Sequence, residues 1–128
     1  MVFFASTKEE LHGLLADIKE YMKTLKLELK GNEQIFPVAE NRYDRSGRGL
    51  DFVGFVFYHN QTLMRKGIKK NFCREVAKLN RRKNVKRKEY KQALAPWLGW
   101  AKYSNSRKLT KTIIKPIYYE SVLRFAAC

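Results

Sequence analysis

A row of positively charged side chains recurs at helical spacing in the second half of the chain. Its members lie four residues apart: Lys70, Arg74, Lys78 and Arg82. Residues at this spacing share one face of a helix, and each like-charged pair costs an isolated helix roughly 0.2–0.5 kcal/mol. Phosphates of a nucleic acid would offset that repulsion, because their neutralisation releases counterions, whereas a merely solvated face would leave it uncompensated. The row therefore favours contact with nucleic acid.

The net charge of the chain is concentrated around this row. The 128 residues include 27 Lys and Arg against 12 Asp and Glu, a net charge of +15. Residues 65–115 contain 18 basic and 2 acidic side chains, whereas residues 1–64 contain 8 basic and 9 acidic ones. This asymmetry points to a polyanionic partner, with nucleic acid ahead of an acidic membrane surface. We expect the cations along the outer ridge of a helical arm and assign nucleic-acid contact to Arg65, Lys66, Lys69, Lys70, Arg74, Lys78, Arg81 and Arg82.

Three aromatic residues follow the basic row, and two of them are candidates for stacking on bases or ribose. Trp97 fits an apolar stripe and is expected in the core. Trp100 and Tyr103 fall beside that stripe, and we assign both to the nucleic-acid interface because aromatic rings stack on bases. Packing between helices is the alternative for both.

No combination of residues predicts catalysis by this chain alone. The sequence has no glycine-rich phosphate loop and no nucleophile elbow, and its basic half has no paired carboxylates. His12 and His59 lack a partner that would make either a general base. Asp44 and Asp51 are better explained by turn formation than by metal binding. We expect no catalytic residue, bound metal or cofactor in this chain.

The composition is that of a globular domain. Hydrophobic residues make up 45% of the chain and aromatic residues 13%, which allows a packed core. No apolar run approaches the roughly 20 residues that span a bilayer. Cys73 and Cys128 are too few for a disulfide framework or a zinc site. We expect a cytoplasmic protein that is not bound to a membrane.

The first half of the chain is expected to contain one helix and several strands. A capping box at Ser6 or Thr7 begins an amphipathic helix that runs to residue 24. Apolar alternation and β-branched or aromatic content predict strands at residues 1–5, 25–29, 34–38 and 50–58, with a return strand at 63–65. Pro37 restricts one of them to an edge, and Gly54 marks a bulge or a close backbone approach in the longest.

From Gly67 onward the apolar spacing becomes helical. One stripe comprises Ile68, Phe72, Val76 and Leu79, and a second comprises Tyr90, Ala93, Leu94, Trp97, Leu98 and Ala101. Pro96 predicts a kink or restart in the second helix. Asn105 or Ser106 caps a third helix that stops at Pro116. For residues 117–128 the pattern leaves helix and extended chain open.

These elements predict an α+β fold, with an antiparallel sheet and a helix in residues 1–66 and a basic lobe of two to three helices in residues 67–128. A buried strand that starts at Met1 needs strands on its edges. We therefore expect the chain to be the C-terminal piece of a longer fold, and expect either a homodimer through this N-terminal strand or a rearranged sheet.

Several ordered segments closely resemble the C-terminal half of bacterial reverse transcriptases of the group II intron, retron and diversity-generating retroelement type. They are Ser-Thr-Lys-Glu-Glu-Leu through Leu-Lys-Leu-Glu-Leu, then Gln-Ile-Phe-Pro-Val, Gly-Leu-Asp-Phe-Val-Gly-Phe at residues 49–55, and Leu-Met-Arg-Lys at residues 63–66. The likeness covers roughly residues 1–115. It implies that the chain is the end of a polymerase palm followed by a thumb.

The resemblance also implies roles for particular residues. Phe52, Val53, Gly54 and Phe55 correspond to the primer grip, and the helices after Lys66 to the thumb that follows the template–primer duplex. The partners implied are an RNA template or RNA–DNA hybrid and the missing fingers and palm of the parent. The family's catalytic aspartates, which hold Mg²⁺ in the parent, precede the position of Met1, so this chain alone is expected to be inactive. The family's Lys-Thr pair, whose lysine acts as the general acid of nucleotidyl transfer, is also absent. Lys30 is a weak substitute for that lysine. The alternative is an autonomous RNA- or DNA-binding module without enzymatic activity.

Overall fold

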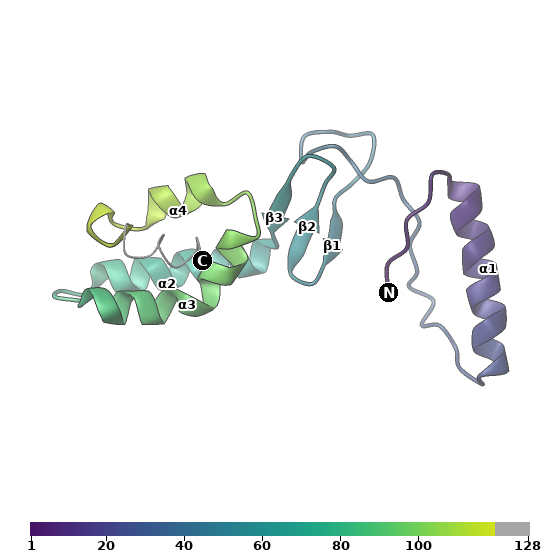
Figure 1. Ribbon diagram of the computed structural model, residues 1–128, viewed down its shortest axis with the longest axis horizontal. Coiled ribbons are helices and arrows are strands. Elements are labelled where there is room, and N and C mark those ends of the chain that lie inside the picture. Colours follow the sequence, from purple (N-terminus) through teal and green to yellow (C-terminus); the bar gives the residue numbers. More distant parts are fainter. Residues whose placement is uncertain (120–128) are drawn as a thin grey trace. The chain divides into compact units, whose positions relative to one another are not determined.

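The chain has an α+β fold, and the computed structural model describes residues 1–119 of it (Figure 1). It consists of two compact units, Met1–Pro37 and Val38–Cys128. The first contains helix α1 (Lys8–Thr24). The second contains a small antiparallel sheet followed by helices. The boundary that we expected at residue 66 falls inside this second unit.

Helix α1 begins at the capping box that the sequence predicts. The backbone N–H of Glu10 donates to Thr7 Oγ1 at 3.2 Å, and the N–H of Thr7 donates to Glu10 Oε2 at 3.3 Å. An ion pair between Lys19 and Glu33 ties the segment after the helix back to it. The hydrogen bond from Lys19 is the main reason that the pKa of Glu33 lies below its ordinary value.

The strands predicted at residues 1–5, 25–29 and 34–38 are wrong. None of these segments pairs as a strand, and only Val38 forms an isolated bridge, to Arg48. The expected burial of the N-terminal run is also wrong, since Met1 is 87% exposed and Phe4 75% exposed. Local apolar alternation is not sufficient for a strand, because a strand needs a neighbour that accepts its backbone hydrogen bonds. The homodimer that we expected through this segment stays a prediction.

The sheet consists of β1 (Leu50–Phe52), β2 (Phe55–Phe57) and β3 (Thr62–Met64), in that order. The single strand predicted at residues 50–58 is instead a hairpin, in which Phe52 pairs with Phe55. Its two turn residues, Val53 and Gly54, have φ of 47° and 82°, as a two-residue turn of the hairpin type requires. The predicted return strand is confirmed as β3, which pairs with β2.

The helices α2 (Lys66–Arg81), α3 (Arg87–Lys102) and α4 (Arg107–Ile113) enclose the core. Both predicted apolar stripes are confirmed, because the buried core consists of Met64, Phe72, Val76, Leu79, Tyr90, Leu94, Leu98 and Ile114. Contrary to the predicted restart, α3 continues through Pro96, which lies on its exposed side where water can solvate the freed carbonyl. Helix α4 ends before Pro116, as predicted.

Residues 117–119, which begin the segment left open by the sequence, are helical. The remainder of that segment lies outside the described residues. Of the helices in residues 1–119, none combines the length and the apolar character that a membrane crossing requires.

A hydrogen-bonded tyrosine links the three helices. The fully buried Tyr90 donates from its hydroxyl to Asn80 Oδ1 at 2.9 Å, and Asn80 Nδ2 donates to the carbonyl of Ile113 at 3.0 Å. The Tyr90 ring also stacks on Tyr118, with 4.2 Å between centroids. These contacts join α2, α3 and the segment after α4.

This tyrosine predicts a loss of stability at alkaline pH. Burial raises the pKa of Tyr90 above its ordinary value of 10.0, so the unfolded chain releases the phenolic proton first. The stabilisation is therefore fully present below about pH 10 and is lost as the pH rises through the folded-state pKa. Denaturant unfolding between pH 8 and 11 should show a steeper decline for the wild type than for Tyr90→Phe. Equal declines would contradict this role.

Candidate nucleic-acid interface

Helix α2 presents a basic face opposite the core. Its buried residues, Phe72, Val76 and Leu79, lie on one side of the helix. The cations on the other side form what we call the α2 row, namely Lys70, Arg74, Lys78 and Arg81, and all four are exposed. Arg82, which the four-residue spacing placed in the row, lies just beyond the helix end in an extended conformation. The last member of the row is therefore Arg81 and not Arg82, because the helix ends at Arg81.

The predicted contact residues differ in how far carboxylates neutralise them. Arg65 pairs with Asp51, its Nε lying 2.7 Å from Oδ1, and Arg82 Nη1 lies 3.1 Å from Glu89 Oε1. Lys78 has a long contact of 4.0 Å with Glu75. The remaining predicted cations have no carboxylate partner within residues 1–119: Lys66, Lys69, Lys70, Arg74 and Arg81. These five are available to an external anion, whereas Arg65 and Arg82 each form an ion pair within the chain.

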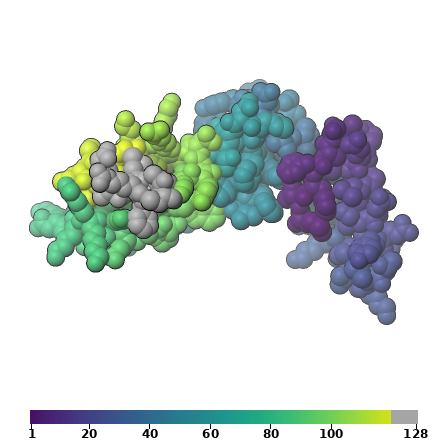
Figure 2. Space-filling model, in the orientation of Figure 1, coloured from purple at the N-terminus to yellow at the C-terminus, as the bar shows by residue number. Residues whose placement is uncertain are grey.

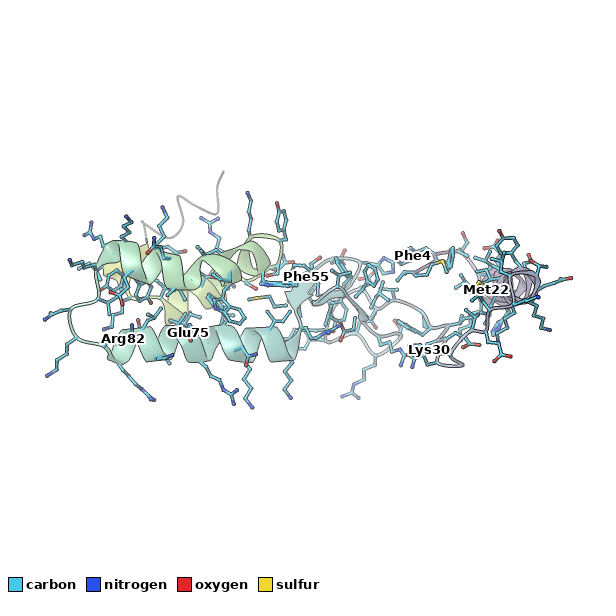
Figure 3. All side chains as sticks on the ribbon, turned by 90° about the horizontal axis from the view of Figure 1, so that it is seen from below. Phe4, Met22, Lys30, Phe55, Glu75 and Arg82 are labelled. Atoms are coloured by element: carbon cyan, nitrogen blue, oxygen red, sulfur yellow. The ribbon has the colours of Figure 1, made fainter. Side chains whose placement is uncertain are left out.

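The expectation of a single cationic ridge is wrong. Long basic side chains project from the outer sides of both α2 and α3 (Figure 3), and α4 exposes Arg107, Lys108 and Lys111. Each helix of the bundle buries one face and leaves its polar residues on the other, so exposed positive charge lies on α2, α3 and α4. Counting every fourth residue also passed over four further cations between α2 and the first turn of α3, which we call the turn cluster: Lys83, Lys86, Arg87 and Lys88.

The β1–β2 hairpin is docked on the helices through its glycine. A Cβ at Gly54 would lie 2.4 Å from the ring of Trp100 and 2.7 Å from Ile68, so the predicted close backbone approach is confirmed. Phe55 packs on the same tryptophan, with 4.9 Å between ring centroids, and lies where the sheet meets the helices (Figure 3). In contrast, Phe52 and Val53 are 43% and 64% exposed at the hairpin tip. Of the four predicted primer-grip residues, Gly54 and Phe55 therefore pack on the helices, whereas Phe52 and Val53 are exposed to solvent.

The two candidate stacking residues have different surroundings. Trp100 is half-buried against Gly54 and Phe55, which is the packing alternative, and Trp97 packs 6.3 Å from Phe72, as expected for the core. Tyr103 is 69% exposed at the end of α3, with Lys102 Nζ 5.8 Å from its ring centroid. Of the pair, only Tyr103 presents most of its ring to solvent.

Asn105 joins the sheet to the helices, and sequence reasoning missed it. Its side-chain Oδ1 accepts from the N–H of Thr62 at 2.7 Å, and its own N–H donates to the carbonyl of Thr62 at 2.7 Å. The residue thus extends the edge of β3. In the sequence it had the signature of a helix cap, and the N-cap of α4 is in fact Ser106.

Asp44 and Asp51, the two aspartates weighed for metal binding, serve structural roles. Asp44 accepts from the N–H groups of Ser46 and Glu40, which lower its pKa, and Asp51 pairs with Arg65. Among the described residues, His, Cys, Asp and Glu side chains form no group of three or more suited to a metal ion.

The comparisons with protein-family models, curated proteins and solved structures find no match to this chain. The likeness to reverse transcriptases therefore depends on the sequence segments quoted above.

Proposed function

We propose that the chain binds duplex nucleic acid through its phosphates, as the end of the palm and the thumb of a bacterial reverse transcriptase. The α2 row is the observation that carries the proposal. Four exposed cations lie on one face of α2, backed by a packed apolar core. Such a surface binds the backbone of an RNA template–primer or RNA–DNA hybrid without reading its sequence. The proposed setting is the cytoplasm.

The hairpin gives this proposal its polymerase character. Its exposed tip precedes α2 in the same unit, and the Gly54–Trp100 contact holds it in place. In a primer grip, this tip would contact the primer end while the α2 row contacts the duplex. Nucleotide addition would then require the catalytic aspartates and Mg²⁺ of the missing fingers and palm.

The salt dependence of binding tests the proposal. A chain that neutralises four to six phosphates should lose affinity with a log–log slope of about −4 to −5 for duplex. Fluorescence anisotropy of a labelled RNA–DNA hybrid, between about 0.05 and 0.2 M salt, measures this slope. Mixed-sequence hybrids of equal length should bind equally. Binding that hardly changes with salt would overturn the proposal.

The alternative function is an autonomous RNA- or DNA-binding module without enzymatic activity. It is favoured by the second unit, whose core, α2 row and hairpin all lie within Val38–Cys128. Such a module needs no other chain to bind nucleic acid. Reading the coding sequence upstream of Met1 separates the two, because an in-frame Tyr-x-Asp-Asp run belongs only to the polymerase.

Val53 provides a test of the hairpin. A β-branched residue at positive φ destabilises the fold by about 1–2 kcal/mol. Because the Val53 side chain is exposed, its burial does not offset this strain. Val53→Asn should therefore raise the free energy of unfolding by about 1 kcal/mol, since Asn tolerates this conformation. If the tip contacts the primer, the same variant should bind a recessed template–primer more weakly. A variant that is more stable and binds equally well would exclude the tip from the interface.

A further inference from the structure

The turn between α2 and α3 carries the densest positive charge in the described residues. Six of the eight residues at 81–88 are Lys or Arg, and none is acidic. The nearest carboxylate in the sequence, Glu89, is paired with Arg82. Three of the cations, Lys86, Arg87 and Lys88, stand at the start of α3, where the helix dipole disfavours positive charge. A bound anion would relieve both the mutual repulsion and the unfavourable dipole interaction.

The backbone of the turn is held in place. Val85 packs against the core, and its carbonyl accepts from the Tyr118 hydroxyl at 2.9 Å. Lys115 Nζ donates to the carbonyl of Asn80 at 2.9 Å, and the Arg82–Glu89 pair spans the turn. Asn84, with φ of 59°, supplies the left-handed residue that reverses the chain. The backbone that carries the turn cluster is therefore already fixed before a ligand binds, so binding costs little backbone entropy.

The turn cluster and the α2 row face different directions. The row spans residues 70–81, about 16 Å of helix at 1.5 Å per residue, and its side chains point away from the core across the helix axis. The turn lies at the end of the bundle away from the sheet (Figure 1). In the space-filling view, the atoms at this end of the bundle belong to the middle of the colour range, where the turn lies in the sequence (Figure 2). The row thus lies along the side of α2 and the turn cluster at the end of the bundle, and the two surfaces adjoin at Arg81.

We infer that the turn cluster binds the phosphates of a second duplex segment while the α2 row binds the first. This inference rests on the proposed function. Membrane-binding surfaces insert apolar side chains, yet Val85, the apolar residue of the turn, packs inward. The turn has no aromatic residue for stacking on single-stranded bases. Duplex has the higher charge density, so it is the form that lysines and arginines alone bind best.

Binding stoichiometry tests this inference. The probe is a hairpin-capped RNA stem of about one helical turn, roughly 10 base pairs. Isothermal titration at low salt should show two stems bound for each wild-type chain. The turn variant, in which Lys83, Lys86, Arg87 and Lys88 are changed to Gln, should bind one stem. The row variant, in which Lys70, Arg74, Lys78 and Arg81 are changed to Gln, should also bind one, and it removes the same number of charges.

Three outcomes distinguish the two proposals. A wild-type chain that binds one stem overturns the inference, and so does a turn variant that still binds two. A wild-type chain that binds no stem overturns the proposed function itself. Light scattering of the wild-type complex gives the number of stems for each chain without any substitution, so the inference can be tested even if a variant does not fold.

Discussion

Neutralising the α2 row is expected to lower the affinity for duplex by about 100- to 1000-fold at physiological salt. The affinity is best compared in the background of the turn variant, because in that variant the row is the remaining binding surface. Each phosphate contact contributes about 0.9 to the log–log salt slope, so removing four cations should also lower the slope by about 3 to 4. The substituted side chains are exposed, so the fold should persist.

The matched control removes four charges from the first unit. Lys8, Lys23, Lys26 and Lys30 are exposed, and none has an ion pair with another residue of 1–119. Changing them to Gln in the same background lowers the net charge equally, but should change the affinity by less than about tenfold. Equal losses in the two variants would mean that total charge, and not the geometry of α2, determines binding.

Gly54→Ala is expected to destabilise the second unit by about 2–4 kcal/mol. Two costs combine, because alanine is strained at a φ of 82° and its Cβ would overlap the ring of Trp100. For a unit of this size, such a loss lowers the melting temperature by about 10–25 °C. Thermal unfolding followed by tryptophan fluorescence reports directly on this contact.

Gly67→Ala is the matched control for that substitution. Gly67 lies in α2, and a Cβ built there would meet nothing within 4 Å. Because alanine favours helix over glycine, and because Gly67 is only the second residue of the helix, this variant should lose no stability and gain at most about 0.5–1 kcal/mol. If both glycine variants lowered the melting temperature by the same amount, the docking of the hairpin on Trp100 would not be the cause.

The local signals in the sequence predicted the helices well. The capping box at Thr7 and Glu10 needs only residues three apart, and the core stripe through Phe72 and Val76 needs only residues four apart. Helical hydrogen bonds close within one turn, so the information that specifies a helix lies within a short segment. The concentration of charge in residues 65–115 was likewise visible without any structure.

Strands and side-chain roles depended on partners outside the segment itself. The apolar run at residues 1–5 is not a strand, whereas residues 50–57 form a hairpin whose two strands pair with each other and whose second strand, β2, also pairs with β3. Trp100 serves packing because Gly54 leaves room for its ring, and Asn105 extends β3 because Thr62 lies opposite.

The sequence by itself therefore determined that α1 to α4 are helical, which faces of α2 and α3 are buried and in which part of the chain the positive charge lies. The tertiary structure alone decided which apolar segments pair as strands, which aromatic rings remain exposed and which cations carboxylates engage. The physical reason is that helix formation and net charge are properties of contiguous residues. Strand pairing, docking and ion pairing require groups that the chain brings together only when it folds.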